Sequence, residues 1–177
     1  SYVPPNLKLL WELGEGEKTN YGVKFASAVG MAAIVLNDNS SNSSSHQPRQ
    51  WISYAMNKLH RHFGLWLVDN DGGWAEGPHY QRFSAASYIP FAIAHHNFVN
   101  GESEEYNGTV YPPLTGNPDF NDNAEWGVKI RQPNGARPDI DDSYRNSWFY
   151  NGYLASHLDN PLLAWDYQVS TRPYYHD

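Results

Sequence analysis

The chain alternates between long segments with helical apolar periodicity and polar loops. From about residue 20 to residue 36, apolar residues recur at steps of three and four, and many small residues there favour close helix packing. Thr19 or Asn20 can cap this helix. Similar patterns predict helices over about residues 48–66, 81–98, 118–131 and 143–158, and a shorter one beginning near Pro161. Pro90 predicts a kink within the third helix.

Polar, turn-rich segments separate these helices, and no alternation of apolar and polar residues marks a sheet. The 177 residues suffice for one domain. Helical units recur about every 30 residues, as in arrays of hairpins in which each unit depends on its neighbours. The sequence therefore predicts an all-α fold of antiparallel helical hairpins.

The amino-acid composition favours some classes of function and argues against others. Aromatic residues make up 15% of the chain, with 7 Trp and 13 Tyr, and such amphipathic rings favour a sugar-binding cleft over a plain core. The net charge is −7 and no basic stripe is visible, which argues against nucleic acid as a partner. The chain has no cysteine and therefore no disulfide or thiolate site. No apolar run approaches the ~20 residues of a membrane span.

The loop at residues 71–80, DGGWAEGPHY, is the most distinctive candidate for chemistry. Its glycines flank Trp74, Glu76, His79 and Tyr80 just before a predicted helix, where functional side chains concentrate. The alternative is a tight turn around a buried tryptophan.

Three further features are candidates for function. Asn20, in the segment KTNY at residues 18–21, is either a helix cap or a functional amide. Arg137, in the loop GARPDIDDS at residues 135–143, is a candidate to face a ligand carboxylate, while Asp142 or Ser143 is expected to cap the next helix. His95 and His96 point in different directions on one helix and cannot share a metal, and His60 and His62 fail the same test. We therefore expect no metal and no cofactor.

These segments carry a family resemblance. Residues 71–80 resemble the loop of heparinase II/III-like and alginate lyases that ends in a catalytic tyrosine. Residues 19–22, TNYG, are similar to the family's segment with a substrate-binding asparagine, and residues 133–143 resemble a later Gly/Asp/Ser loop. The three occur in the family's order.

The resemblance implies that residues 1–177 form a single partial (α/α)-toroid domain of a larger polysaccharide lyase, periplasmic or secreted, acting on an acidic polysaccharide or oligosaccharide. It implies Tyr80 and Asn20 as catalytic residues. The implied substrate-binding residues are Trp74, Glu76, His79, Arg82 and Arg137.

The chemistry explains these residue types. The lyase removes the C5 proton of a uronic acid and expels the group on C4. An amide such as Asn20 stabilises the charge that develops on the carboxylate. A tyrosinate such as Tyr80 takes the proton, but with a pKa of about 10 a free tyrosine is only ~0.1% ionised at pH 7. A neighbouring cation must lower that pKa. The candidate cations are His79, Arg82 and Arg137.

The family's site also includes a His or Tyr from a C-terminal β-rich domain, and an N-terminal part of the toroid precedes the Asn segment. Neither lies in these residues, and Ser1–Pro5 do not resemble a signal peptide, so we expect the chain to start inside a larger protein and its site to be incomplete by itself.

Two other functions stay open. A glycoside hydrolase would need two carboxyl groups across the scissile bond, such as Asp71 with Glu76, or Glu76 with Asp142. A non-catalytic glycan-binding module would keep the aromatic residues without needing Tyr80. The lyase hypothesis requires Asn20, Tyr80 and Arg137 to open onto one concave face.

Overall fold

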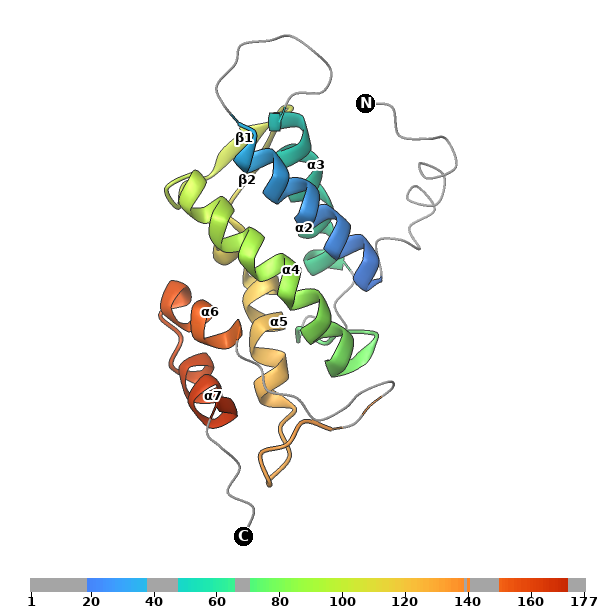
Figure 1. The fold of residues 1–177 in the computed structure, drawn as a ribbon, viewed down its shortest axis with the longest axis vertical. Helices are drawn as coiled ribbons and strands as arrows, with labels where there is room; N and C mark the ends of the chain where they lie inside the picture. The colour runs from blue at the N-terminus through green and yellow to red at the C-terminus, as the bar shows by residue number, and fades with distance from the viewer. Residues whose placement is uncertain (1–18, 38–47, 66–70, 139, 141–149, 172–177) are drawn as a thin grey trace.

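The computed structural model describes residues 19–37, 48–65, 71–138, 140 and 150–171 (Figure 1). Within these ranges the chain is mostly helical, as predicted, with one short β-hairpin and one turn of 3-10 helix. The elements are α2 (Asn20–Val35), α3 (Pro48–Leu65), α4 (Gly77–Phe98), β1 (Glu104–Tyr106), β2 (Thr109–Tyr111), η1 (Leu114–Gly116), α5 (Pro118–Lys129), α6 (Tyr150–Leu158) and α7 (Pro161–Thr171).

Two elements differ from the sequence prediction. Helix α4 begins at Gly77, four residues before the predicted start at Gln81, because Pro78 suits the first turn of a helix. The segment 101–117 is not all loop, since β1 and β2 pair there as an antiparallel hairpin. Asn107 and Gly108 at its tip both have positive φ, the conformation that an Asn-Gly hairpin turn requires. The first part of the predicted helix 143–158 lies outside the described residues.

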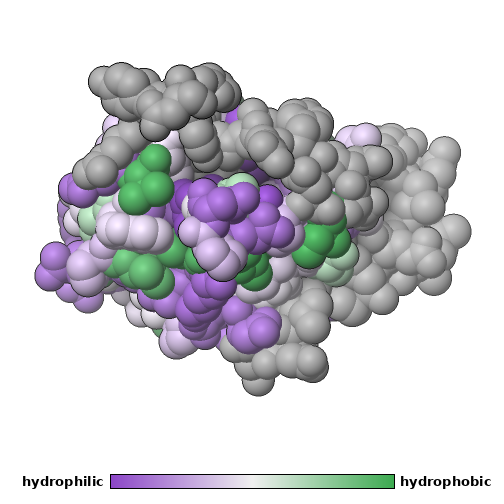
Figure 2. Space-filling model, turned by 90° about the horizontal axis from the view of Figure 1, so that it is seen from below, coloured by the Kyte–Doolittle hydropathy of each residue, from purple (hydrophilic) through white to green (hydrophobic). Residues whose placement is uncertain are grey.

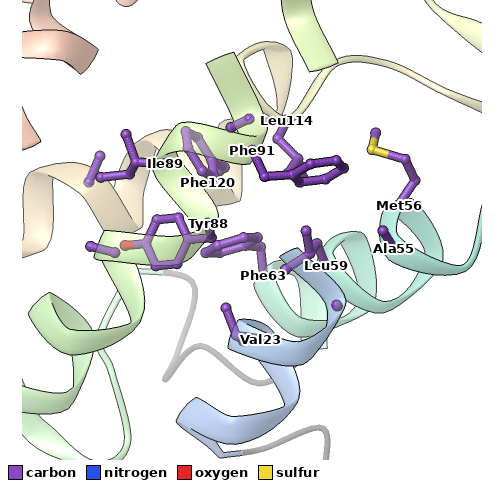
Figure 3. Packing of buried hydrophobic residues seen from close by; sticks show 14 of the residues in the cluster. Val23, Ala55, Met56, Leu59, Phe63, Tyr88, Ile89, Phe91, Leu114 and Phe120 are labelled. Carbon is purple, nitrogen blue, oxygen red and sulfur yellow. The ribbon is translucent and has the colours of Figure 1, made fainter. Parts of the chain in front are cut away.

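The core forms where α2, α3 and α4 pack together and α5 closes one side. Phe63 of α3, Tyr88 of α4 and Phe120 of α5 meet edge to face, with ring centroids 5.1–5.8 Å apart (Figure 3). Each comes from a different helix, so this cluster fixes the relative positions of three helices. Helices α6 and α7 form a hairpin beside α5 and α4 (Figure 1).

A chain of polar contacts, buried at His95 and Tyr106 and exposed at Arg49, ties the hairpin to the helices. Nε2 of His95 lies 3.1 Å from the Tyr106 hydroxyl, which donates to Glu104, and Glu104 pairs with Arg49. The single Tyr106 hydroxyl hydrogen goes to Glu104, so Nε2 of His95 is the donor in the other bond. Burial lowers the pKa of His95 to about 4, although the Glu104 charge opposes that shift. His95 is therefore neutral in the native protein at pH 7.

Gly30 allows α2 to lie close to its neighbours. A Cβ there would lie 2.8 Å from Cβ of Ala55 and 2.4 Å from the Phe91 ring. The ring can turn aside, but the Ala55 Cβ can move only if α2 and α3 separate. We expect Gly30→Ala to lower the free energy of unfolding by about 1–2 kcal/mol, despite alanine's ~1 kcal/mol advantage in helices. Gly116→Ala is the control, because nothing lies within 4 Å of its added Cβ. Chemical denaturation measures both, and equal stabilities would contradict the close packing.

The neutral His95 predicts acid sensitivity. The unfolded chain binds a proton at this histidine near pH 6.5, whereas the native protein does so only near pH 4. Stability should therefore fall as pH drops through this window, by about 3 kcal/mol from this group. His95→Gln keeps a donor toward Tyr106 and removes the titration. We expect its urea-unfolding free energy to vary less between pH 6.5 and 4 than that of the wild type. Parallel pH profiles would show that His95 does not carry the effect.

Candidate functional site

The first turns of α2 and α4 meet at Glu76, the residue just before α4. Its Oε2 accepts the main-chain N–H of Asn20 at 2.7 Å, and its Oε1 accepts the Asn20 side-chain amide at 3.2 Å. Residues 56 positions apart in the sequence are thus held together. The two helices run side by side in the same direction from this point (Figure 1). Asn20 and the start of α4 therefore share one corner of the molecule. The lyase hypothesis requires Asn20, Tyr80 and Arg137 to open onto one concave face, whereas Asn20 is only 3% exposed and Arg137 is 9% exposed and paired with Asp166.

Glu76 caps α2 in place of the residues expected to do so. Thr19 occupies the N-cap position but its side chain makes no capping hydrogen bond. The Glu76 carboxylate instead accepts an N–H that the helix itself leaves unpaired, and it lies where the helix dipole favours negative charge. We expected Glu76 to bind substrate. Its oxygens instead accept hydrogen bonds from Asn20 and from the Trp74 indole, so its role in this structure is to hold α2 and the loop together.

Trp74 is part of the core. It is 4% exposed, and its ring lies between His62, at 4.8 Å between centroids, and Tyr88, stacked at 6.2 Å. The ring faces are covered by protein, so the prediction that Trp74 stacks on a sugar is not supported, and the alternative of a turn around a buried tryptophan describes it. The indole N–H is 3.3 Å from Oε2 of Glu76.

Helix α5 holds the rest of the loop in place. A Cβ at Gly72 would lie 2.2 Å from the Asp122 carbonyl oxygen, and the φ of Gly72 is +83°, so only glycine fits there. The Asn123 amide donates to the Gly72 carbonyl at 2.8 Å, and its oxygen accepts the Tyr88 hydroxyl at 2.8 Å. This anchoring keeps Glu76 and the start of α4 in a defined position.

His79 and Tyr80 lie in the first turn of α4, both partly buried. Their rings meet edge to face with centroids 5.2 Å apart, and Tyr80 packs against the margin of the core. Arg82 follows in the second turn and is also partly buried. The surface at this lower end of the molecule combines polar areas with separate apolar patches (Figure 2).

The structure assigns Arg137 a different position from the one expected. Its guanidinium donates to both oxygens of Asp166 on α7 at 2.8 Å, and its side chain is 9% exposed. Arg131 and Asn151 also bind the fully buried Asp166. Arg137 thus joins a buried cluster that fixes α6 and α7 to the end of α5. Its proposed partner, a substrate carboxylate, is replaced by a carboxylate of the protein itself.

The remaining candidate residues either serve a turn or lie outside the described residues. Asp71 is exposed and accepts the main-chain N–H of Gly73 at 3.2 Å, as in a tight turn. Asp142 and Ser143 lie outside the described residues. In the described part of the chain, no three histidine or acidic side chains gather as a metal site would require. None of the described helices combines the length and hydropathy needed to cross a membrane.

Sequence reasoning missed one residue at this corner. Lys24 lies one turn after Asn20 on α2, and its ammonium group is 3.4 Å from the centroid of the Phe83 ring on α4. The four-residue spacing between Asn20 and Lys24 was a usable signal, since residues at that spacing share a helix face.

No known family model matches the chain, and no curated protein or solved structure matches it either.

The Asp166 cluster yields a stability prediction. Asp166→Ala would leave the two nearly buried guanidinium groups of Arg131 and Arg137 without their carboxylate, and we expect a loss of about 3–5 kcal/mol. Lys129→Gln is the control, because its ion pairs on α5 are substantially exposed and should contribute less than about 1 kcal/mol. Thermal unfolding compares the two. Similar small losses would mean that the cluster does not hold α6 and α7.

Proposed function

We propose that this chain is part of the helical toroid of a heparinase II/III-like polysaccharide lyase, which cleaves a uronic-acid-containing glycan by β-elimination. The observation that carries the proposal is the meeting of Asn20 and the first turn of α4, which bears Tyr80, through Glu76. The two residues that the chemistry needs come from segments far apart in the sequence, and both lie at helix N-terminal ends. In the same proposal, the helical hairpins continue into a complete toroid and a C-terminal β-rich domain supplies a further His or Tyr.

The corner is chemically suited to a carboxylate. The N-terminus of α2 directs its partial positive charge toward it, and its donors already bind one carboxylate, that of Glu76. The Asn20 side-chain nitrogen carries two hydrogens, of which Glu76 accepts one. The other is the donor we assign to the uronate carboxylate. It would stabilise the charge that forms there as the C5 proton leaves.

Tyr80 is the base in this mechanism. The tyrosinate oxygen takes the C5 proton, the electron pair of that C–H bond forms the C4–C5 double bond, and the C4–O bond breaks. The leaving oxygen then receives a proton from Tyr80. Ionisation of Tyr80 requires a nearby cation. His79, in edge-to-face contact with Tyr80, and Arg82 are the candidates, because Arg137 is committed to Asp166.

The arrangement favours a lyase over a hydrolase. A hydrolase would need the Glu76 carboxyl group to face the scissile bond, but both of its oxygens already accept hydrogen bonds from Asn20 and Trp74. Asp71, the partner of Glu76 in one of the two possible hydrolase pairs, accepts a main-chain N–H in a turn, and Asp142 of the other pair lies outside the described residues. A non-catalytic glycan-binding module remains the second alternative and would not depend on the Tyr80 hydroxyl.

The decisive test removes that hydroxyl. In the full-length protein, Tyr80→Phe should abolish eliminative cleavage of a uronate polymer and leave glycan binding nearly intact, because packing survives and the proton acceptor does not. General base catalysis contributes roughly 10²- to 10⁴-fold, so the loss should be large. Asn20→Ala should also reduce turnover. Absorbance of the new double bond conjugated to the carboxylate measures the rate.

Tyr153→Phe is the matched control, since Tyr153 is a largely exposed tyrosine on α6. It should turn over like the wild type. Wild-type turnover by Tyr80→Phe would exclude Tyr80 as the base. A product with a hydrated reducing end would identify a hydrolase instead, and binding without any turnover would identify a binding module.

A further inference from the structure

The outer face of α2 is apolar along its whole length. Residues 21, 25, 28, 32 and 35 lie three or four positions apart and are all exposed, and none of them is charged or strongly polar. Tyr21 is 76% exposed and Val35 likewise 76%. A helix face of this kind on a protein surface indicates a binding surface.

The charged residues of α2 and of its neighbour α3 are all cationic. Helices α2 and α3 contain no aspartate or glutamate, although the whole chain has a net charge of −7. Their cationic residues are Lys24, Arg49, Lys58 and Arg61. Arg49 is paired with Glu104. Two neighbouring helices that contribute apolar and cationic side chains but no acidic ones favour a ligand with flat apolar faces and negative charge, which describes an acidic glycan.

Lys24 is the cationic residue of α2 and lies one helical turn after Asn20. Its ammonium group lies 3.4 Å from the Phe83 carbonyl oxygen and 3.4 Å from the centroid of the Phe83 ring. No carboxylate pairs with Lys24 among the described residues. Its charge is therefore held in place by a ring and a carbonyl, and it keeps capacity for an anion.

The position of this pair follows from the helix geometry. Lys24 lies one turn after Asn20 on α2, and Phe83 lies three residues after Tyr80 on α4. The two helices run in the same direction from Glu76 (Figure 1). The Lys24–Phe83 contact therefore lies about one helical turn further along both helices than Asn20 and Tyr80. Phe83 is 45% exposed, and Tyr21 adds a second exposed ring next to Asn20.

We propose that Lys24, Tyr21 and Phe83 form a subsite for an anionic sugar flanking the uronic acid that is cleaved. This rests on the proposed function. The ammonium group binds the carboxylate or sulfate of the flanking sugar, and the two rings contact its apolar face. Lys24 then determines specificity: it strengthens binding of long anionic substrates and takes no part in the proton transfer.

The test uses the full-length protein with Lys24→Gln, Lys24→Arg and Lys129→Gln. For an oligouronate of about six sugars, Lys24→Gln should raise KM about 5- to 20-fold and leave kcat within about twofold. Lys24→Arg should restore most of the affinity, because the charge returns. Lys129→Gln, an exposed lysine on α5, should match the wild type. The dependence of KM on salt should weaken in Lys24→Gln alone, since one ionic contact is lost.

Three probes identify the bound group: an unsulfated oligouronate, a sulfated one, and a carboxyl-reduced sulfated one, each measured by binding to Tyr80→Phe so that no turnover occurs. A Lys24→Gln effect on the unsulfated probe means that the subsite binds a carboxylate, and an effect that survives carboxyl reduction means that it binds sulfate. Tyr21→Ala should weaken binding several-fold and provides a second variant if Lys24→Gln unfolds.

These experiments distinguish a failure of the proposed function from a failure of the subsite. If the wild type neither binds nor cleaves any uronate polymer, the proposed function fails. If it cleaves but Lys24→Gln keeps the wild-type KM and salt dependence, the subsite is wrong and the lyase assignment stands. If Tyr21→Ala instead changes the sedimentation coefficient and leaves KM unchanged, the surface is a contact between protein copies, which also overturns the subsite.

Discussion

The Glu76 carboxylate accepts hydrogen bonds from the main chain and side chain of Asn20 and from the indole of Trp74, and this one group joins the N-terminal ends of two helices. Each contact supports the others: the carboxylate satisfies an N–H that α2 leaves unpaired, and the buried Trp74 fixes the loop that carries Glu76. The position of Asn20 relative to the start of α4 depends on it. The candidate chemistry therefore rests on a structural anion that occupies part of the site.

That arrangement has an electrostatic consequence. A second carboxylate near Asn20 would be repelled by Glu76 unless cations compensate. The buried ion cluster removes Arg137 from that role by pairing it with Asp166. Compensation then falls to the N-terminus of α2 and to the cationic side chains near the corner. The absence of acidic residues from α2 and α3 is consistent with such a requirement, because it keeps further negative charge away from the neighbouring surface.

The rigid core explains how the corner keeps its geometry. Gly30 allows α2 to approach α3 and α4 closely, and the rings of Phe63, Tyr88 and Phe120 set the positions of α3, α4 and α5. Asn123 then connects Tyr88 to the loop before α4 through Gly72. Packing and buried hydrogen bonds thus connect the aromatic core to the residues proposed to act on substrate, so that core substitutions are expected to disturb the site as well.

The sequence by itself determined the helices, because apolar spacing of three and four residues reports which face each segment buries. It also singled out Asn20 and the loop ending in Tyr80, and the Asn107-Gly108 pair was a readable signal for the hairpin that the helical pattern obscured. Only the tertiary structure decided which of the candidate side chains are already bound to other residues of the protein. Glu76 meets Asn20 across 56 positions and Arg137 meets Asp166 across 29, and local patterns carry no information about such pairings. Trp74 in a glycine-rich loop looked like a surface ring, yet the packing of α3 and α4 buried it, because the free energy of covering a large apolar ring outweighs the local preference of the loop.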